Sequence, residues 1–199
     1  WIREGGTRTV KDSSGNNCGK LTGGWAYNGG GINVSKNSTL YFQGGTITGC
    51  KGSATGGGIC NKGTCYFEGG VIDNCWSLDC GGIFNFDAGC TLTISGDHAV
   101  SGSANLVRNT SIDGLYIDVA QPCTITQSED SYSTLFDLRQ NTTINGEQMT
   151  VNGNGVAFST QGGMTLRLDS ADLVVSAIMP FKGSSLSDDH LDITNSRLE

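Results

Sequence analysis

The stretch that decides the fold is Gly57-Gly58-Ile59, followed by Thr64-Cys65-Tyr66-Phe67-Glu68-Gly69-Gly70-Val71-Ile72. The same pattern begins earlier at Gly30-Gly31-Ile32 and later at Gly81-Gly82-Ile83. The isoleucine of the motif therefore recurs at nearly constant intervals, from Ile32 to Ile59 and then to Ile83. A repeat of this length is typical of a solenoid, in which each repeat forms one turn of a coil and packs on the next.

Within each repeat, apolar and polar side chains alternate with a period of two. Cys65 and Phe67, for example, alternate with Tyr66 and Glu68. This period predicts a β-strand with one buried face, and no segment shows the helical period that would place apolar residues on one side of a helix. We therefore expect an all-β parallel β-helix, in which equivalent residues of successive rungs stack about 4.8 Å apart. The expected inward ladders are Leu40, Cys65 and Leu92, and Phe42, Phe67 and Ile94.

The second half of the chain keeps the alternation but loses the glycine motif. The interval from Phe136 to Phe158 again matches the length of one rung. We predict a single domain over residues 1–199 with roughly eight rungs, regular and glycine-rich over residues 20–102 and irregular over residues 103–199. A division into two domains near residue 105 is the alternative.

Composition and charge exclude or disfavour several classes of protein. The chain has 31 Gly but only 2 Pro, and Gly does not recur at every third position, which excludes collagen. With 12 basic and 19 acidic residues the net charge is -7, which disfavours binding to nucleic acid. No apolar run is long enough to cross a bilayer. The start at Trp1, without a signal peptide, suggests a monomeric fragment of a larger protein.

The glycine motif at residues 29–32, followed by Thr-Leu-Tyr-Phe-Gln-Gly-Gly-Thr-Ile-Thr-Gly-Cys at residues 39–50, resembles the glycine-rich β-helix repeats of large bacterial surface proteins. The resemblance covers residues 20–102, and the remainder only by strand pattern. It implies a right-handed coil and an extracellular, cell-surface or secreted location, because such coils occur in adhesins and autotransporter passengers. Similar coils also carry polysaccharide lyases and hydrolases, so the fold alone does not decide the function.

Most of the cysteines are regularly spaced, with a longer and a shorter interval in alternation. The regular set is Cys50, Cys60, Cys65, Cys75, Cys80 and Cys90. An even number of cysteines indicates disulfide bonds in an oxidising compartment. Cys50 and Cys75 occupy the same position in successive repeats, so they are expected to stack within disulfide reach, whereas Cys75 and Cys80 could instead close a corner loop. Buried thiols are the alternative. We expect no metal ion and no cofactor, since Cys-x-x-Cys and paired-histidine motifs are both missing.

Acidic residues are the candidates for catalysis. They are Asp113, Asp118, Asp137 and the run Asp188-Asp189-His190. Glycosidases need two carboxylates that face one groove, but adjacent residues of a strand point to opposite faces. The Gly-His-Gly and Arg-x-Lys motifs of β-helical pectin hydrolases are also missing. We therefore predict no catalytic residue, with a polysaccharide-active enzyme kept as an alternative.

Aromatic residues are the best indication of function. Tyr41 and Tyr66 are expected to align on the outward face of one strand, one rung apart, and Trp25, Tyr27 and Trp76 at corners. Outward rings can stack on sugars or anchor a protein partner, or they can form a pair that protects the sheet. We predict a non-catalytic surface or secreted module for adhesion or ligand display, which binds a host or environmental glycan or protein through Tyr41, Tyr66 and Trp76. A structural stalk is the second alternative.

Overall fold

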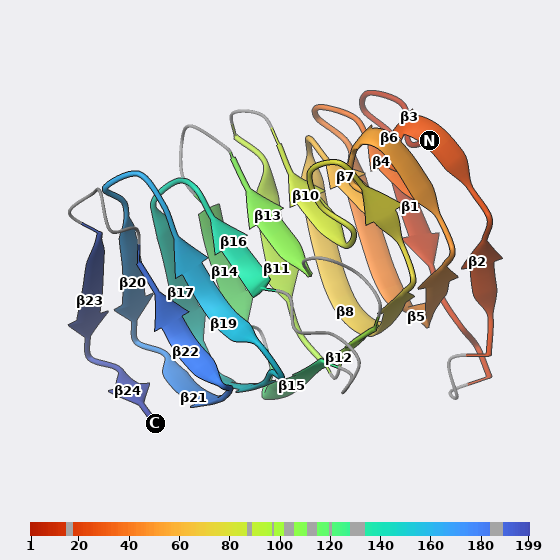
Figure 1. Ribbon diagram of the computed structural model, residues 1–199. Helices are drawn as coiled ribbons and strands as arrows, with labels where there is room; N and C mark the ends of the chain where they lie inside the picture. Colours follow the sequence, from red (N-terminus) through yellow and green to blue (C-terminus); the bar gives the residue numbers. More distant parts are fainter. Residues whose placement is uncertain are drawn as a thin grey trace.

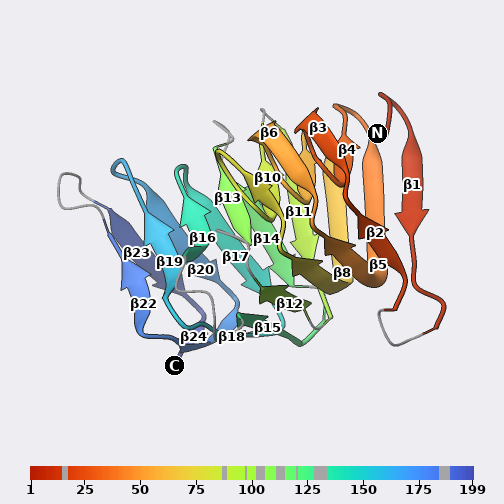
Figure 2. The same cartoon turned by 45° about the vertical axis from the view of Figure 1, so that its right-hand side comes forward.

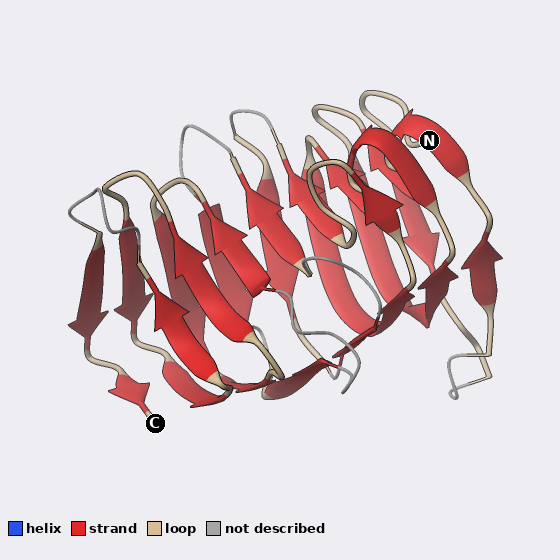
Figure 3. Ribbon diagram, viewed as in Figure 1, coloured by secondary structure: helices blue, strands red, loops and turns tan. Residues whose placement is uncertain are grey.

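The computed structural model describes residues 1–14, 18–86, 89–96, 98–101, 106–110, 115–119, 121–127, 134–183 and 189–199. Across these ranges the regular structure consists of β-strands, and the paired strands are parallel. The strands stack into one elongated coil, with the N-terminus near one end and the C-terminus at the other (Figures 1 and 3). The predicted all-β parallel β-solenoid is therefore confirmed.

The first sheet receives one strand from each turn. Its strands are β4 (Ile32–Val34), β7 (Ile59–Asn61), β10 (Ile83–Asn85), β13 (Val107–Asn109), β16 (Thr134–Leu138), β19 (Val156–Thr160) and β22 (Met179–Lys182). Seven passages through this sheet correspond to about six complete turns. The expected number of roughly eight rungs is slightly too high, because the described residues before β4 and after β22 add no further strand to this sheet.

In the described part of the chain, the second sheet has 14 strands in two arms, which are joined by the long strands β5 (Thr39–Thr48) and β8 (Thr64–Asp73). The first arm adds β1 (Thr7–Val10), β11 (Thr91–Ile94), β14 (Leu115–Val119), β17 (Thr142–Gly146), β20 (Thr165–Asp169) and β23 (His190–Thr194). The second arm adds β2 (Lys20–Thr22), β12 (His98–Ser101), β15 (Cys123–Gln127), β18 (Gln148–Asn152), β21 (Asp172–Ser176) and β24 (Arg197–Leu198).

Among the described residues, a third, short sheet forms near the N-terminal end of the coil (Figure 2). It consists of β3 (Trp25–Asn28), β6 (Lys51–Thr55) and β9 (Trp76–Ser77). The glycine-rich rungs therefore have a third side that the described strands of the later rungs do not form.

The core is built from ladders of equivalent residues, as predicted. Leu40 pairs with Cys65 and Cys65 with Leu92, and the neighbouring ladder joins Phe42, Phe67 and Ile94. In the later rungs the rings of Phe136, Phe158 and Phe181 stack with centroid distances of 4.8 and 5.4 Å. Full burial of each large apolar side chain contributes about 1.5 to 3 kcal/mol. The ladders are the main source of stability, since no rung can bury its apolar face alone.

The glycines of the motif have two different roles. Gly56 has a φ of 58°, which is the positive angle that we expect of a corner glycine. Gly57 lies instead where a Cβ atom would stand 2.6 Å from the backbone nitrogen of Trp76. Gly30 likewise lies against the backbone of Lys51. The second glycine of each triplet is therefore required by the close approach of the next rung rather than by its own backbone angle.

Replacing Gly57 with Ala should lower the free energy of unfolding by about 2 kcal/mol or more, because the added methyl group overlaps a backbone that cannot move alone. The matched control is Gly19→Ala, where the new Cβ would be 3.5 Å from its nearest neighbour and the effect should stay within about 0.5 kcal/mol. Urea unfolding of both variants measures the difference. Equal stabilities would contradict the close-approach explanation.

Candidate functional site

The outward side of the third sheet carries exposed aromatic residues. Two of them lie in one register across its three strands, with a lysine between them. Trp25 pairs with Lys51, and Lys51 pairs with Trp76. The side chains of Trp25 and Trp76 are 80% and 52% exposed, and that of Tyr27 is 73% exposed. The alternation along β3 places Trp25 and Tyr27 on the same side. We call Trp25, Tyr27, Lys51 and Trp76 the aromatic face.

The backbone beneath the aromatic face is held firmly. Trp76 donates its backbone N–H to the carbonyl of Cys50 at 2.9 Å, and Lys51 donates to the carbonyl of Gly24 at 2.8 Å. At the other end of these strands, Thr55 Oγ1 donates to Asn28 Oδ1 at 2.7 Å. Gly30 and Gly57 let adjacent rungs approach each other closely beneath the rings. The rings therefore project from a backbone that hydrogen bonds hold to the neighbouring rungs.

One hollow adjoins the aromatic face at Tyr27, and a second hollow adjoins the first at Asn28. The first has a volume of about 420 Å³ and is lined by Trp1, Ala26, Tyr27, Asn28, Asn33 and the glycines at 29–31. The second, of about 560 Å³, shares Trp1, Asn28 and Asn33 and adds Arg3, Glu4, Ser35, Lys36 and Lys62. Trp1 is fixed by a 2.7 Å hydrogen bond from its Nε1 to Ser35 Oγ. Asn33 has a buried Oδ1 atom without a hydrogen-bond partner.

The predicted ligand-binding residues divide between two sheets. Tyr41 and Tyr66 do stack, with ring centroids 4.7 Å apart and ring planes only 5° from parallel, but on β5 and β8 of the second sheet. Each ring covers one face of the other, which favours a role in protecting the sheet. Trp76 lies in the third sheet with Trp25. Ligand binding by Tyr41 and Tyr66 stays a prediction.

The sequence alone predicts Trp25 and Tyr27 at a corner and outside the binding site. The signal that could have included them is the spacing of Trp25, Lys51 and Trp76, which follow one another at intervals of one rung. The alternation of Trp25-Ala26-Tyr27-Asn28 was the second signal.

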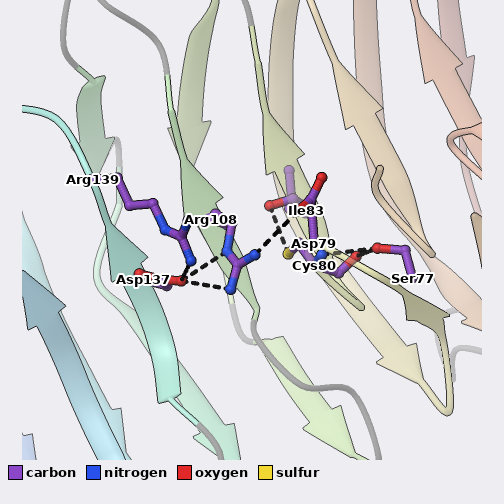
Figure 4. A network of polar contacts seen from close by, with 7 residues as sticks. All are labelled: Ser77, Asp79, Cys80, Ile83, Arg108, Asp137 and Arg139. Atoms are coloured by element: carbon purple, nitrogen blue, oxygen red, sulfur yellow. Dashed lines mark hydrogen bonds and ion pairs between the residues drawn. The ribbon is translucent and has the colours of Figure 1, made fainter. Parts of the chain in front are cut away.

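A network of ion pairs lies on the outer side of the first sheet (Figure 4). Arg108 on β13 donates from Nε to Asp137 Oδ2 on β16 at 2.7 Å, and Arg139 contacts the same oxygen at 3.3 Å. Asp79 approaches Arg108 from the turn after β9, at 3.6 Å. The Asp137 side chain is only 6% exposed. Two guanidinium groups thus neutralise this carboxylate, as in a structural ion pair.

The turn after β9 covers the first sheet beside this network. Ser77 Oγ accepts from the backbone N–H of Cys80 at 2.8 Å, and Cys80 Sγ donates to the carbonyl of Ile83 at 3.3 Å. Cys80 packs with Cys60 and Phe84 in a second apolar cluster, separate from the core of the coil. The outward positions of β7 and β10 are therefore buried.

The other acidic candidates do not join Asp137. Asp118 is on β14 in the second sheet. Asp189 accepts hydrogen bonds from the backbone N–H groups of Gly163 and Met164 at 2.9 and 3.1 Å, which fastens the turn before β20. Asp113 and Asp188 lie outside the described residues. Among the described acidic candidates, the structure brings no two together as a catalytic pair.

Replacing Arg108 with Met should lower the free energy of unfolding by about 3 kcal/mol, because it leaves the buried Asp137 carboxylate with only the more exposed Arg139 as a partner. The double variant Arg108→Met/Asp137→Leu should recover most of that loss, since it removes both buried charges. Urea unfolding of the two variants provides the measurement. A double variant as unstable as the single one would argue against a simple ion pair.

The expected disulfide is wrong for Cys50, Cys75 and Cys80, since all the cysteines, each within the described part of the chain, are thiols. Cys50 and Cys75 do lie on adjacent rungs. Their sulfur atoms instead donate to carbonyls of the preceding rung, Cys50 to Leu21 at 3.7 Å and Cys75 to Ile47 at 3.5 Å. Cys80 belongs to the second apolar cluster, so it does not close a loop with Cys75.

Burial raises the pKa of the Cys65, Cys75 and Cys80 thiols from 9.0 to about 12. Between these values the unfolded chain loses protons that the folded protein keeps. Stability from these groups is therefore complete below pH 9 and is lost as the pH rises toward 12, by about 1.4 kcal/mol per pH unit for each thiol. Urea unfolding at pH 8 and pH 10.5 measures the loss. The control is Cys65→Val, whose loss should be smaller by one thiol, and an unchanged slope would contradict the assignment.

In comparisons with known proteins, the chain matches no family model, no curated protein and no solved structure. Along the described ranges, none of the elements is a helix that is long and apolar enough to cross a membrane. The same residues contain no group of three or more His, Cys, Asp or Glu side chains that could hold a metal ion. The architecture of the chain is a parallel β-solenoid of about six turns.

Proposed function

We propose that this β-solenoid is a non-catalytic binding module, on a cell surface or in a secreted protein, that serves adhesion or ligand display. The observation that carries the proposal is the aromatic face, with Trp25, Tyr27 and Trp76 exposed together on one short sheet. Large rings in water do not stabilise the fold, whereas tryptophan and tyrosine supply much of the affinity of binding surfaces. The resemblance of residues 20–102 to bacterial surface repeats supports the proposed location.

Rigidity supports the same function. The rings stand on strands whose backbones are hydrogen-bonded to neighbouring rungs, so little backbone freedom would be lost when a ligand binds. A stalk would need the coil but not the exposed rings. A glycoside hydrolase would need two carboxylates about 5 to 9.5 Å apart that face one groove, and of the acidic candidates predicted from the sequence, Asp118 and Asp137 are on different sheets.

The first experiment is binding of the labelled protein to an array of mucins, matrix proteins and polysaccharides. Trp25→Ala and Trp76→Ala should each weaken the affinity at least tenfold, because each removes one ring from the contact surface. The matched control is Ile178→Ala, which removes an exposed apolar side chain, 74% accessible, from a position outside the aromatic face.

The variant Tyr41→Ala/Tyr66→Ala tests the alternative site on the second sheet. If it alone abolishes binding, the aromatic face is the wrong surface. Silence of the wild-type protein across the whole array would favour the stalk, and cleavage of a polysaccharide would favour the enzyme.

A further inference from the structure

The register of the third sheet sets the distance between its rings. Trp25, Lys51 and Trp76 occupy one column on three adjacent strands. Two strand spacings separate the backbones of Trp25 and Trp76 by about 10 Å, which is the length of about two sugar rings in an extended chain. The column runs across the rungs, along the axis of the coil. A linear ligand with a regular repeat could therefore place one unit on each tryptophan.

A polar group separates the two tryptophans of the aromatic face. Lys51 stands between the two tryptophans, and the exposed Ser53 follows it on the same side of β6. A surface that docks another protein concentrates its apolar groups in a contiguous, desolvated centre. Tryptophans with a polar group between them suit sugars instead, because a sugar offers an apolar ring face and hydroxyl groups at its rim.

The charge of Lys51 and of the hollow beyond Tyr27 and Asn28 is opposite to that of the whole molecule. The chain has a net charge of -7. Lys51 on the face and Arg3, Lys36 and Lys62 in the adjoining hollow are basic, and Glu4 is the acidic residue among the lining side chains. An acidic protein with a local basic region attracts anions to that region. The ligand that this distribution favours is therefore negatively charged.

The adjoining hollows also offer hydrogen bonds. Asn28 and Asn33 line both, and the buried Oδ1 atom of Asn33 lacks a partner. A buried acceptor without a donor is costly. Because that atom is inaccessible from the hollow, a ligand there would find its hydrogen bonds at Asn28 and at the rest of the Asn33 side chain.

We propose that the aromatic face binds an extended acidic polysaccharide, which lies along the coil axis with sugar rings on Trp25 and Trp76 and an acidic substituent, carboxylate or sulfate, at Lys51. This inference rests on the proposed binding function and names its ligand class. Tyr27 lies between this surface and the hollow that Asn28 and Asn33 line, so the polysaccharide extends over Tyr27 toward that hollow.

Native gel electrophoresis through three polymers with one β-linked glucan backbone tests the proposal. The polymers are carboxymethyl cellulose, cellulose sulfate and neutral hydroxyethyl cellulose. The protein should be retarded by one or both acidic polymers and much less by the neutral one, and retardation should weaken with salt. Because the protein is itself acidic, non-specific attraction to a polyanion does not explain retardation.

Three variants locate the contact. Trp25→Ala and Trp76→Ala should abolish retardation, and Lys51→Gln should weaken affinity for the acidic polymer at least fivefold. The matched control, Lys182→Gln, removes a lysine from β22 in the first sheet and should bind as the wild type does. The acidic polymer that retards the protein more strongly identifies the substituent as carboxylate or sulfate.

The possible failures are distinct. Equal retardation by the neutral polymer, or full binding by Lys51→Gln, would overturn the acidic ligand but keep a binding module. Loss of array binding to a protein upon Trp25→Ala, without retardation by any glucan, would overturn the polysaccharide and also keep the binding module. Absence of binding in both the gels and the array would overturn both proposals.

Discussion

The parallel hydrogen-bond ladder between successive rungs is the constraint on which the rest of the structure depends. It holds Ile32, Ile59 and Ile83 in register, and so it gives each residue of one turn the same environment as its equivalents in the next. An inward column must therefore be apolar along its length, and an outward column becomes a row of side chains with a fixed spacing. The approach is so close at the corners that Gly57 has no room for a side chain against Trp76.

The same ladder decides which polar groups are structural. Arg108 and Asp137 are neighbours because their strands are adjacent, and the turn that carries Asp79 and Cys80 encloses them. Such a buried pair contributes little net stability, but loss of one partner is costly. The thiols follow the same geometry, because Cys50 and Cys75 each donate to a carbonyl of the preceding rung, and Cys75 also interacts with the Cys50 side chain without a bond between the sulfur atoms. Stacking within reach is thus insufficient for a disulfide.

The sequence predicts the structural features that repeat from rung to rung, and it does not predict those that occur once. The core ladders and the Tyr41–Tyr66 stack were predictable because they depend only on period and alternation. The burial of the Arg108–Asp137 pair and the cluster around Cys80 were not, because both depend on the path of the turn after β9, which occurs once. The grouping of Trp76 with Trp25 depends on where the long strand β8 ends and a new sheet begins, which alternation alone does not fix.

The glycine motif and the aromatic face occupy the same part of the coil. The third sheet comprises only strands between Trp25 and Ser77, in the rungs where the triplets at 29–31 and 56–58 let the corners approach closely. Residues 81–82 form only a pair of glycines, and the described part of the following rungs adds no strand to that side. Glycine at these positions is therefore a requirement of the third sheet, and through it of the spacing between Trp25 and Trp76. The glycine-rich rungs therefore carry the aromatic face, which is the proposed binding surface, and the later rungs extend the core that supports it.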